Sequence, residues 1–142
     1  MFRKNKAIKP ILLGLFGLYF LFFTVRSVVR VPAWKDPLSL NSAAIKVSKN
    51  SARANVFMGT ALYKKALDEP DRDVKQQMMN EVEAYIDQAL SILPNYNNAN
   101  KMKAGVLAQH YKLDGDIYRL LTGFKQVARR RPDNSYMHEY LS

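Results

Sequence analysis

Residues 11–25, with the sequence ILLGLFGLYFLFFTV, carry no charged side chain and separate a short basic flank from a longer polar part. As a helix these fifteen residues span about 22 Å, less than the roughly 30 Å hydrocarbon core of a bilayer. An extension to residues 8–29 is long enough, and it places the basic side chains of Lys9 and Arg26 near its ends, where they can reach the headgroups. We therefore predict one transmembrane helix over residues 8–29.

The basic flank at residues 1–7 makes a cleaved signal peptide the main alternative to a retained anchor. The small-x-small pattern of a cleavage site does not follow, because residues 26–30 read RSVVR, and we expect the helix to be retained. Four basic side chains precede the apolar segment and three follow it before residue 36. The positive-inside rule therefore favours a cytoplasmic amino terminus and a single-pass protein whose domain is periplasmic or otherwise non-cytoplasmic.

Most of the positive charge lies beside this helix. The formal net charge is +10, but residues 1–35 hold seven basic and no acidic side chains, whereas residues 36–142 hold fifteen basic and twelve acidic ones, a net charge of +3. Charge at the membrane flanks attracts anionic lipid. A nucleic-acid-binding protein would carry clustered positive charge on its soluble part, so we expect no nucleic-acid partner.

Residues 30–50 are expected to connect the membrane helix to the soluble domain. Pro32, Asp36 and Pro37 interrupt the chain just outside the bilayer. Trp34 fits the membrane interface, where amphipathic rings concentrate, and it fits equally well beneath the first soluble helix. The residues predicted to lie at the membrane interface are Lys9, Arg26, Arg30 and Trp34.

The soluble part is predicted to be entirely helical, because apolar residues recur every three or four positions and no long stretch alternates with period two. Leu40, Ala43, Ala44 and Val47 are expected to form the buried face of the first soluble helix. Asp73, with a glutamine three residues later, resembles a capping box at the start of the third soluble helix. The helices are predicted at residues 38–47, 52–67, 73–93, 98–113 and 117–131, with a last helical fragment at 135–141.

Two of the predicted helices end alike. Residues 82–94 match residues 120–132, with apolar residues and a final proline at the same spacings and an offset of 38 residues. A helix with a small residue, Gly59 or Gly105, precedes each of them. This pattern resembles the tetratricopeptide repeat (TPR), a helix-turn-helix unit of about 34 residues. It predicts a short TPR-like solenoid with one repeat at residues 51–96, which includes an insertion, a second repeat at 97–134, and a tail at 135–142.

The membrane-proximal part resembles a narrower family. The sequences TVR at residues 24–26, WKD at 34–36 and NSARAN at 50–55, followed by Gly59, are similar to the junction in transmembrane and TPR-containing glycosyltransferases. In that family the last membrane helix leads directly into a repeat domain on the non-cytoplasmic side. The family's catalytic acidic residues lie in an early loop between membrane helices, which this sequence does not contain. The resemblance therefore implies topology and a recognition role, not activity.

The remaining polar patterns favour structure over chemistry. Asp71 with Asp73, and Asp114 with Asp116, have the Asp-x-Asp spacing of a metal-nucleotide site. Both pairs stand at predicted helix starts, where aspartate accepts backbone N–H bonds and complements the helix dipole. His110 has no fixed partner, and a metal site needs several convergent ligands. We expect no enzymatic activity, no catalytic residue, no metal and no cofactor.

A binding groove follows from the TPR resemblance, since the first helix of each repeat lines the concave face. Counting from Gly59 and Gly105, the predicted groove residues are Arg53, Val56, Thr60, Tyr63, Met102, Val106 and Gln109. Chaperone-binding members of the family hold a terminal carboxylate with lysine and asparagine at such positions, and this count finds neither residue type there, so we do not expect an acidic tail as the ligand. Packing of Val56 and Met102 against a neighbouring helix is the alternative interpretation.

The predicted function is thus a membrane-anchored, TPR-type module that binds a protein or peptide. The alternative is a terminal fragment or accessory part of a membrane glycosyltransferase, which recruits acceptor proteins to the enzyme. The expected partners are a protein or peptide ligand and the membrane. Two further candidate partners are a polytopic membrane protein and a second copy of the chain.

Overall fold

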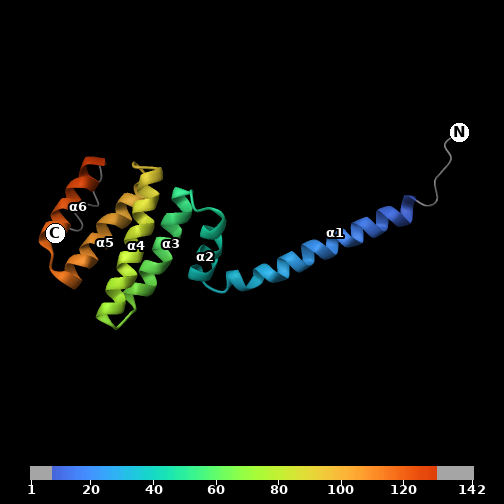
Figure 1. Cartoon of the computed structure of the whole chain (residues 1–142), viewed down its shortest axis with the longest axis horizontal. Helices are drawn as coiled ribbons and strands as arrows, with labels where there is room; N and C mark the ends of the chain where they lie inside the picture. Colours follow the sequence, from blue (N-terminus) through green and yellow to red (C-terminus); the bar gives the residue numbers. More distant parts are fainter. Residues whose placement is uncertain (1–7, 131–142) are drawn as a thin grey trace.

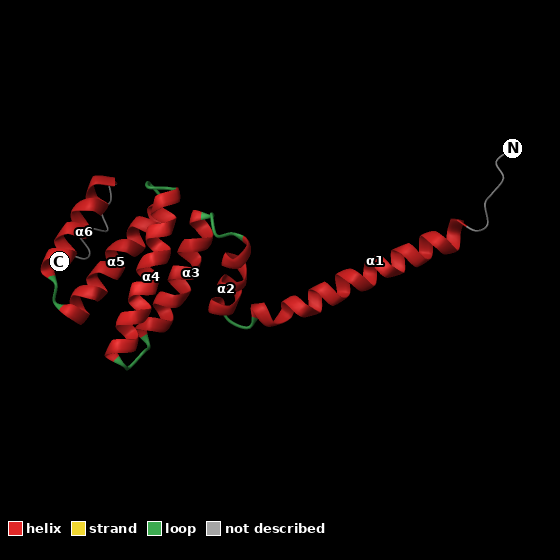
Figure 2. Cartoon of the chain, in the orientation of Figure 1, coloured by secondary structure: helices red, strands yellow, loops and turns green. Residues whose placement is uncertain are grey.

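The computed structural model describes residues 8–130, except for the side chains of residues 8, 9, 30, 32 and 33. Within this range the chain is all helical and contains no strand (Figure 2), which confirms the all-helical part of the predicted fold class. The elements are α1 (Ile8–Arg30), the 3-10 helix η1 (Val31–Trp34), α2 (Pro37–Val47), α3 (Ala52–Leu67), α4 (Arg72–Ile92), α5 (Asn97–Asp114) and α6 (Ile117–Arg130). The predicted tail at residues 135–142 lies outside the described residues.

Helices α2 to α6 form a stack in chain order, and α1 projects from its α2 end (Figure 1). Each helix of the stack packs mainly on its neighbours in sequence, and α3 also contacts α5. The arrangement is therefore quasi-one-dimensional, with one core cluster formed by α3, α4 and α5 and a second cluster between α5 and α6.

Helix α1 is long and apolar enough to cross a membrane, as predicted, and none of its side chains between Pro10 and Val29 is buried. Arg26 near its end is exposed. Trp34 in η1 is 72% exposed. This exposure excludes the alternative in which the tryptophan packs beneath the first soluble helix.

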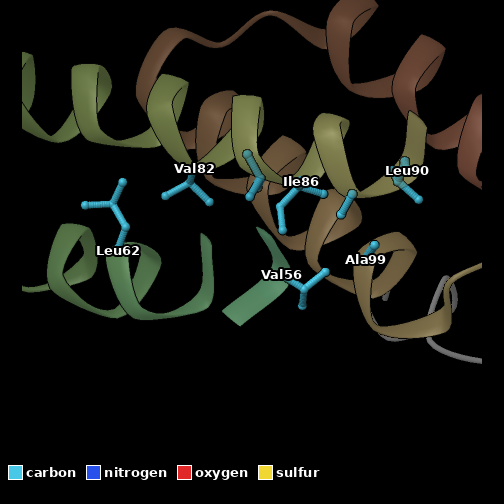
Figure 3. Packing of buried hydrophobic residues seen from close by; sticks show 8 residues of the cluster. Val56, Leu62, Val82, Ile86, Leu90 and Ala99 are labelled. Carbon is cyan, nitrogen blue, oxygen red and sulfur yellow. The ribbon is translucent and has the colours of Figure 1, made fainter. Parts of the chain in front are cut away.

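The main core lies between α3 and α4. Figure 3 shows Val56 and Leu62 of α3 on one side and Val82 and Ile86 of α4 on the other, all buried. Burying each such side chain contributes about 1.5–3 kcal/mol. Gly59 permits the close approach of the two helices, as predicted, because a Cβ there would lie only 3.0 Å from Ile86 Cδ1.

Aspartates cap three of the soluble helices. Asp36 caps α2, and Asp116 accepts the backbone N–H of Arg119 in the first turn of α6 at 3.0 Å. Asp71 accepts two backbone N–H groups of α4 at 2.9 and 3.0 Å. The predicted capping box at Asp73 is therefore wrong, since α4 begins two residues after the preceding proline and Asp71 is its N-cap. The Asp71–Asp73 pair lies at a helix start, as expected. In the second pair only Asp116 does so, because Asp114 is the last residue of α5 and accepts the backbone N–H of Asp116.

Helix α2 directs a different face toward α3 from the one predicted. Ala43, Ala44 and Val47, expected to be buried, are exposed, and no residue of α2 is fully buried. Leu38 packs against the α3–α4 core instead, and the Ser42 hydroxyl lies 3.7 Å from the sulfur of Met58 on α3. The face toward α3 thus includes polar side chains, which an apolar periodicity cannot reveal.

Candidate functional site

Two buried asparagines fix the correspondence between the helix pairs α3–α4 and α5–α6. The side-chain amides of Asn55 and Asn100 each donate hydrogen bonds to the carbonyl oxygens six and four residues earlier, at 2.8 and 2.9 Å in the first case and 2.9 and 3.0 Å in the second. They are 45 residues apart, as are the starts of α3 and α5 and the caps Asp71 and Asp116. The helix pairs therefore correspond at an offset of 45, longer than the 34-residue TPR unit.

This offset corrects the predicted register of α5 by one residue. Gly59 and Gly105, which guided the prediction, are 46 residues apart, and one residue of error turns a side chain by about 100° around a helix. Val106, predicted to line the groove, is accordingly fully buried in the core. The predicted offset of 38 between the second helices, α4 and α6, is seven residues smaller than the observed 45. Seven residues make nearly two helical turns, so the prediction still matched the buried face of α4 with the buried face of α6.

The other predicted groove residues are more accessible. Arg53 is exposed, and Thr60 and Gln109 are half-buried. Tyr63 and Met102 are partly buried against the α3–α4 core. Val56 is almost fully buried, yet it also borders a hollow between the helices.

That hollow is the α3–α5 groove, with a volume of 340 Å³. Its lining comes from the first helix of each pair, and its members are Val56, Phe57, Thr60, Asn98, Lys101 and Met102. At the offset of 45, Val56 corresponds to Lys101 and Phe57 to Met102. Four of the six lining residues are thus equivalent positions in the first helices of two successive pairs, and three of the six were predicted.

The groove combines an apolar floor with positive charge. Phe57 is 43% exposed, and the guanidinium of Arg53 lies 5.2 Å from its ring centroid, a cation–π arrangement. Lys101 and Asn98 contribute an ammonium and an amide, and none of the lining residues is acidic. The argument against an acidic ligand depended on the register that placed Val106 in the groove, and it does not apply at the corrected register.

A buried ionic network lies on another face of α5 and was missed by the sequence interpretation. Lys103 is almost fully buried, and its Nζ atom lies 2.9 Å from Glu83 Oε1 and 2.6 Å from Asp87 Oδ1. Arg119 of α6 also pairs with Glu83. The partners come from three helices and are 16 to 36 residues apart in the sequence. No short-range sequence pattern therefore predicts these contacts.

His110 completes this network. It is fully buried, with Nδ1 3.0 Å from the Gln76 amide nitrogen and Nε2 3.1 Å from Glu83 Oε2, the latter without regular hydrogen-bond alignment. Burial by itself raises the pKa of Glu83, but the contacts with His110 and Lys103 and the charge of Arg119 outweigh it and hold this pKa well below its ordinary value. The cluster cross-links α4, α5 and α6. Among residues 8–130 no group of His, Cys, Asp and Glu side chains could hold a metal ion.

The predicted interface residues are only partly described. Arg26 and Trp34 are exposed at the end of α1 and in η1, whereas the side chains of Lys9 and Arg30 lie outside the described set. No model of a known protein family matches the chain, and no curated protein matches it significantly. The inferences about function therefore depend on α1, the α3–α5 groove and the surfaces around them.

Proposed function

We propose that this protein is a membrane-anchored protein-binding module, in which α1 crosses a bilayer and the α3–α5 groove holds a segment of a partner protein. The supporting observation is the lining of one groove by equivalent residues of α3 and α5. Stacked helix pairs that repeat in this way form a concave surface suited to protein ligands. Binding, rather than catalysis, is the function that this surface favours.

The composition of the groove defines the ligand. A volume of 340 Å³ admits side chains of an extended or helical segment, and Val56, Phe57 and Met102 offer them apolar contacts. Lys101 and Asn98 at its edge suit a carboxylate, through an ionic contact and an amide hydrogen bond. We infer a ligand segment with an apolar side chain next to an acidic one.

Peptide display tests the groove with the full chain in detergent. Peptides selected by the native protein should contain an apolar residue beside an acidic one, and Phe57→Asp and Lys101→Glu should each weaken their binding about tenfold or more, as expected for central contacts. Tyr118→Asp is the matched control, because Tyr118 is 82% exposed on α6. Equal binding by all three variants, with unchanged helical circular dichroism, would exclude the groove as the binding site.

The anchor places this module at a membrane. We propose that α1 is retained, with the domain on the non-cytoplasmic side, because more basic side chains precede α1 than follow it before residue 36. Protease added to sealed, right-side-out spheroplasts should digest the domain. Protection would reverse the orientation, and a mature chain lacking residues 1–30 would identify α1 as a cleaved leader.

A second proposal is an accessory role beside a membrane glycosyltransferase, in which the groove recruits acceptor proteins. The direct passage from α1 through η1 into the helical stack has the element order that the family resemblance implies. Co-purification with a polytopic membrane protein would favour this role. Copies of the chain that are isolated singly from native membranes would favour an independent binding module.

A further inference from the structure

The outer side of α2 carries an apolar stripe that the stack leaves uncovered. Ala43, Ala44 and Val47 are exposed, Val47 by 79%, and the main contacts of α2 are with α3 and η1. Val31 and Trp34 of the adjoining η1 are also exposed. We call these five residues, together with the exposed Lys35, Lys46 and Lys49, the α2 surface.

Positive charge is concentrated in the same layer. Residues 31–67, from η1 to the end of α3, hold six basic and one acidic side chain, whereas residues 68–130 hold nine of each. All six basic side chains of the first group are exposed. The single acidic one, Asp36, accepts hydrogen bonds from the Ser39 backbone and hydroxyl as the cap of α2. The layer next to α1 thus has a net charge of +5, and the layers beyond it have none.

The position of α2 brings this surface close to the end of α1. Helix α1 ends at Arg30, α2 begins at Pro37, and six residues span at most about 20 Å. Figure 1 shows α2 as the first helix of the stack, lying across the end of α1. A bilayer that contains α1 therefore has its headgroups beside the exposed side of α2.

We propose that the α2 surface docks on anionic lipid headgroups of the bilayer that α1 enters. The proposal rests on the membrane anchoring proposed above. Lysine side chains attract an anionic leaflet, and the apolar stripe with Trp34 enters the headgroup boundary. Lys46 and Lys49 also border a hollow of 410 Å³ at the α2–α3 turn, with room for a headgroup. Because α1 tethers the domain, a weak attraction suffices to hold it there.

Docking leaves the binding groove open. The residues that line the α3–α5 groove all belong to α3 and α5, and none belongs to α2. The docked domain therefore presents its groove in a fixed orientation beside the membrane. An undocked domain would swing on the short connection between α1 and α2.

A single thiol reports docking, since the chain contains no cysteine. The full chain carrying Val47→Cys, labelled with an environment-sensitive fluorophore, is reconstituted into vesicles of phosphatidylcholine alone or mixed with phosphatidylglycerol. Quenchers attached to the lipid should reach the label in the mixed vesicles and not in the neutral ones. A label at Tyr118→Cys on α6 should stay inaccessible to them in both. Ala43→Cys repeats the measurement at a second position of the stripe.

Variants with fewer positive charges test whether electrostatic attraction to the lipid causes the docking. Lys46→Gln with Lys49→Gln should lower the ratio of docked to undocked domain by ~30-fold, from the attraction lost at two lysines. Lys125→Gln with Arg129→Gln removes two exposed charges from α6 and should leave the ratio unchanged. Equal quenching at the Val47 and Tyr118 positions, or equal effects of the two double variants, would overturn the proposal. A chain extracted from the vesicles by alkaline carbonate would instead show that the anchor has failed.

Discussion

Glu83 links α4 to α5 and α6 through charged and polar contacts. Its carboxylate contacts Lys103, His110 and Arg119. Glu83→Gln removes the charge that these partners share, and we expect the free energy of unfolding to fall by about 3 kcal/mol, because a nearly buried ammonium loses an ionic partner. Denaturant unfolding followed by circular dichroism measures this change. Glu81→Gln, at an exposed position of the same helix, should leave the midpoint unchanged.

The same carboxylate makes stability depend on pH. The pKa of Glu83 in the folded state lies below its ordinary value of 4.5, so the unfolded chain takes up the proton more readily. Its contribution is complete above pH 4.5 and is lost as the pH falls below that value. The unfolding free energies of the native chain and Glu83→Gln should therefore converge toward acid. A constant difference between pH 7 and pH 3 would contradict this assignment.

The two buried asparagines provide a further residue-level prediction. Asn55→Ala and Asn100→Ala each remove the side-chain donor to two backbone carbonyls, one of which keeps a backbone N–H donor, and each should cost about 1–3 kcal/mol of unfolding free energy. Similar losses at both positions would agree with the 45-residue correspondence. Asn98→Ala is the control, because Asn98 is exposed. A loss at Asn98 as large as that at Asn100 would show that the hydrogen bonds are not the cause.

Sequence patterns predicted individual residues less well than helices. Gly59 was identified correctly because a small residue between large apolar ones signals a close approach of two helices. Asn100 was not identified, since its role lies in bonds to carbonyls that precede its helix. The partners of Glu83 come from two other helices, and no spacing in the sequence brings them together.

At the level of elements, the helix boundaries could be predicted closely. The predicted segment 52–67 coincides with α3, because a capping serine and a polar turn mark its two ends. The orientation of α2 could not be predicted, since alanine and serine suit either side of a short helix. Val56, Thr60 and Met102, which line the α3–α5 groove, were among the predicted residues, and the register of α5 was displaced by one residue.

The packing of α6 against α5 depends on a glycine that the sequence patterns did not identify. A Cβ on Gly123 would overlap Leu107 Cδ1 and lie 2.7 Å from its Cδ2, in the buried contact between α5 and α6. Gly123→Val should therefore destabilise this contact by about 1–3 kcal/mol. Hydrogen exchange should accelerate in α6 and stay slow in α3 and α4. Thr122→Val places the same side chain at the exposed neighbouring position, and comparable exchange in both variants would contradict the overpacking explanation.

At the scale of the whole molecule, the stack is short for its architecture. Two helix pairs and the leading α2 are fewer than the three units that repeat proteins usually need. We predict that residues 36–142 alone are marginally stable or self-associate. Calorimetry with analytical ultracentrifugation measures both properties. A monomer with one cooperative transition well above about 65 °C, the upper end of the mesophile range, would contradict the prediction.

The limited burial of α2 affects how the molecule responds to a pulling force. A partner held in the groove and pulled away from the membrane loads the chain between α3 and α1, and α2 lies in series between them. It has no fully buried side chain, so it yields to tension before the core does. Its eleven residues lengthen by ~20 Å when they pass from helix to extended chain. We therefore expect α2 to extend under a pulling force before the α3–α4 core is strained.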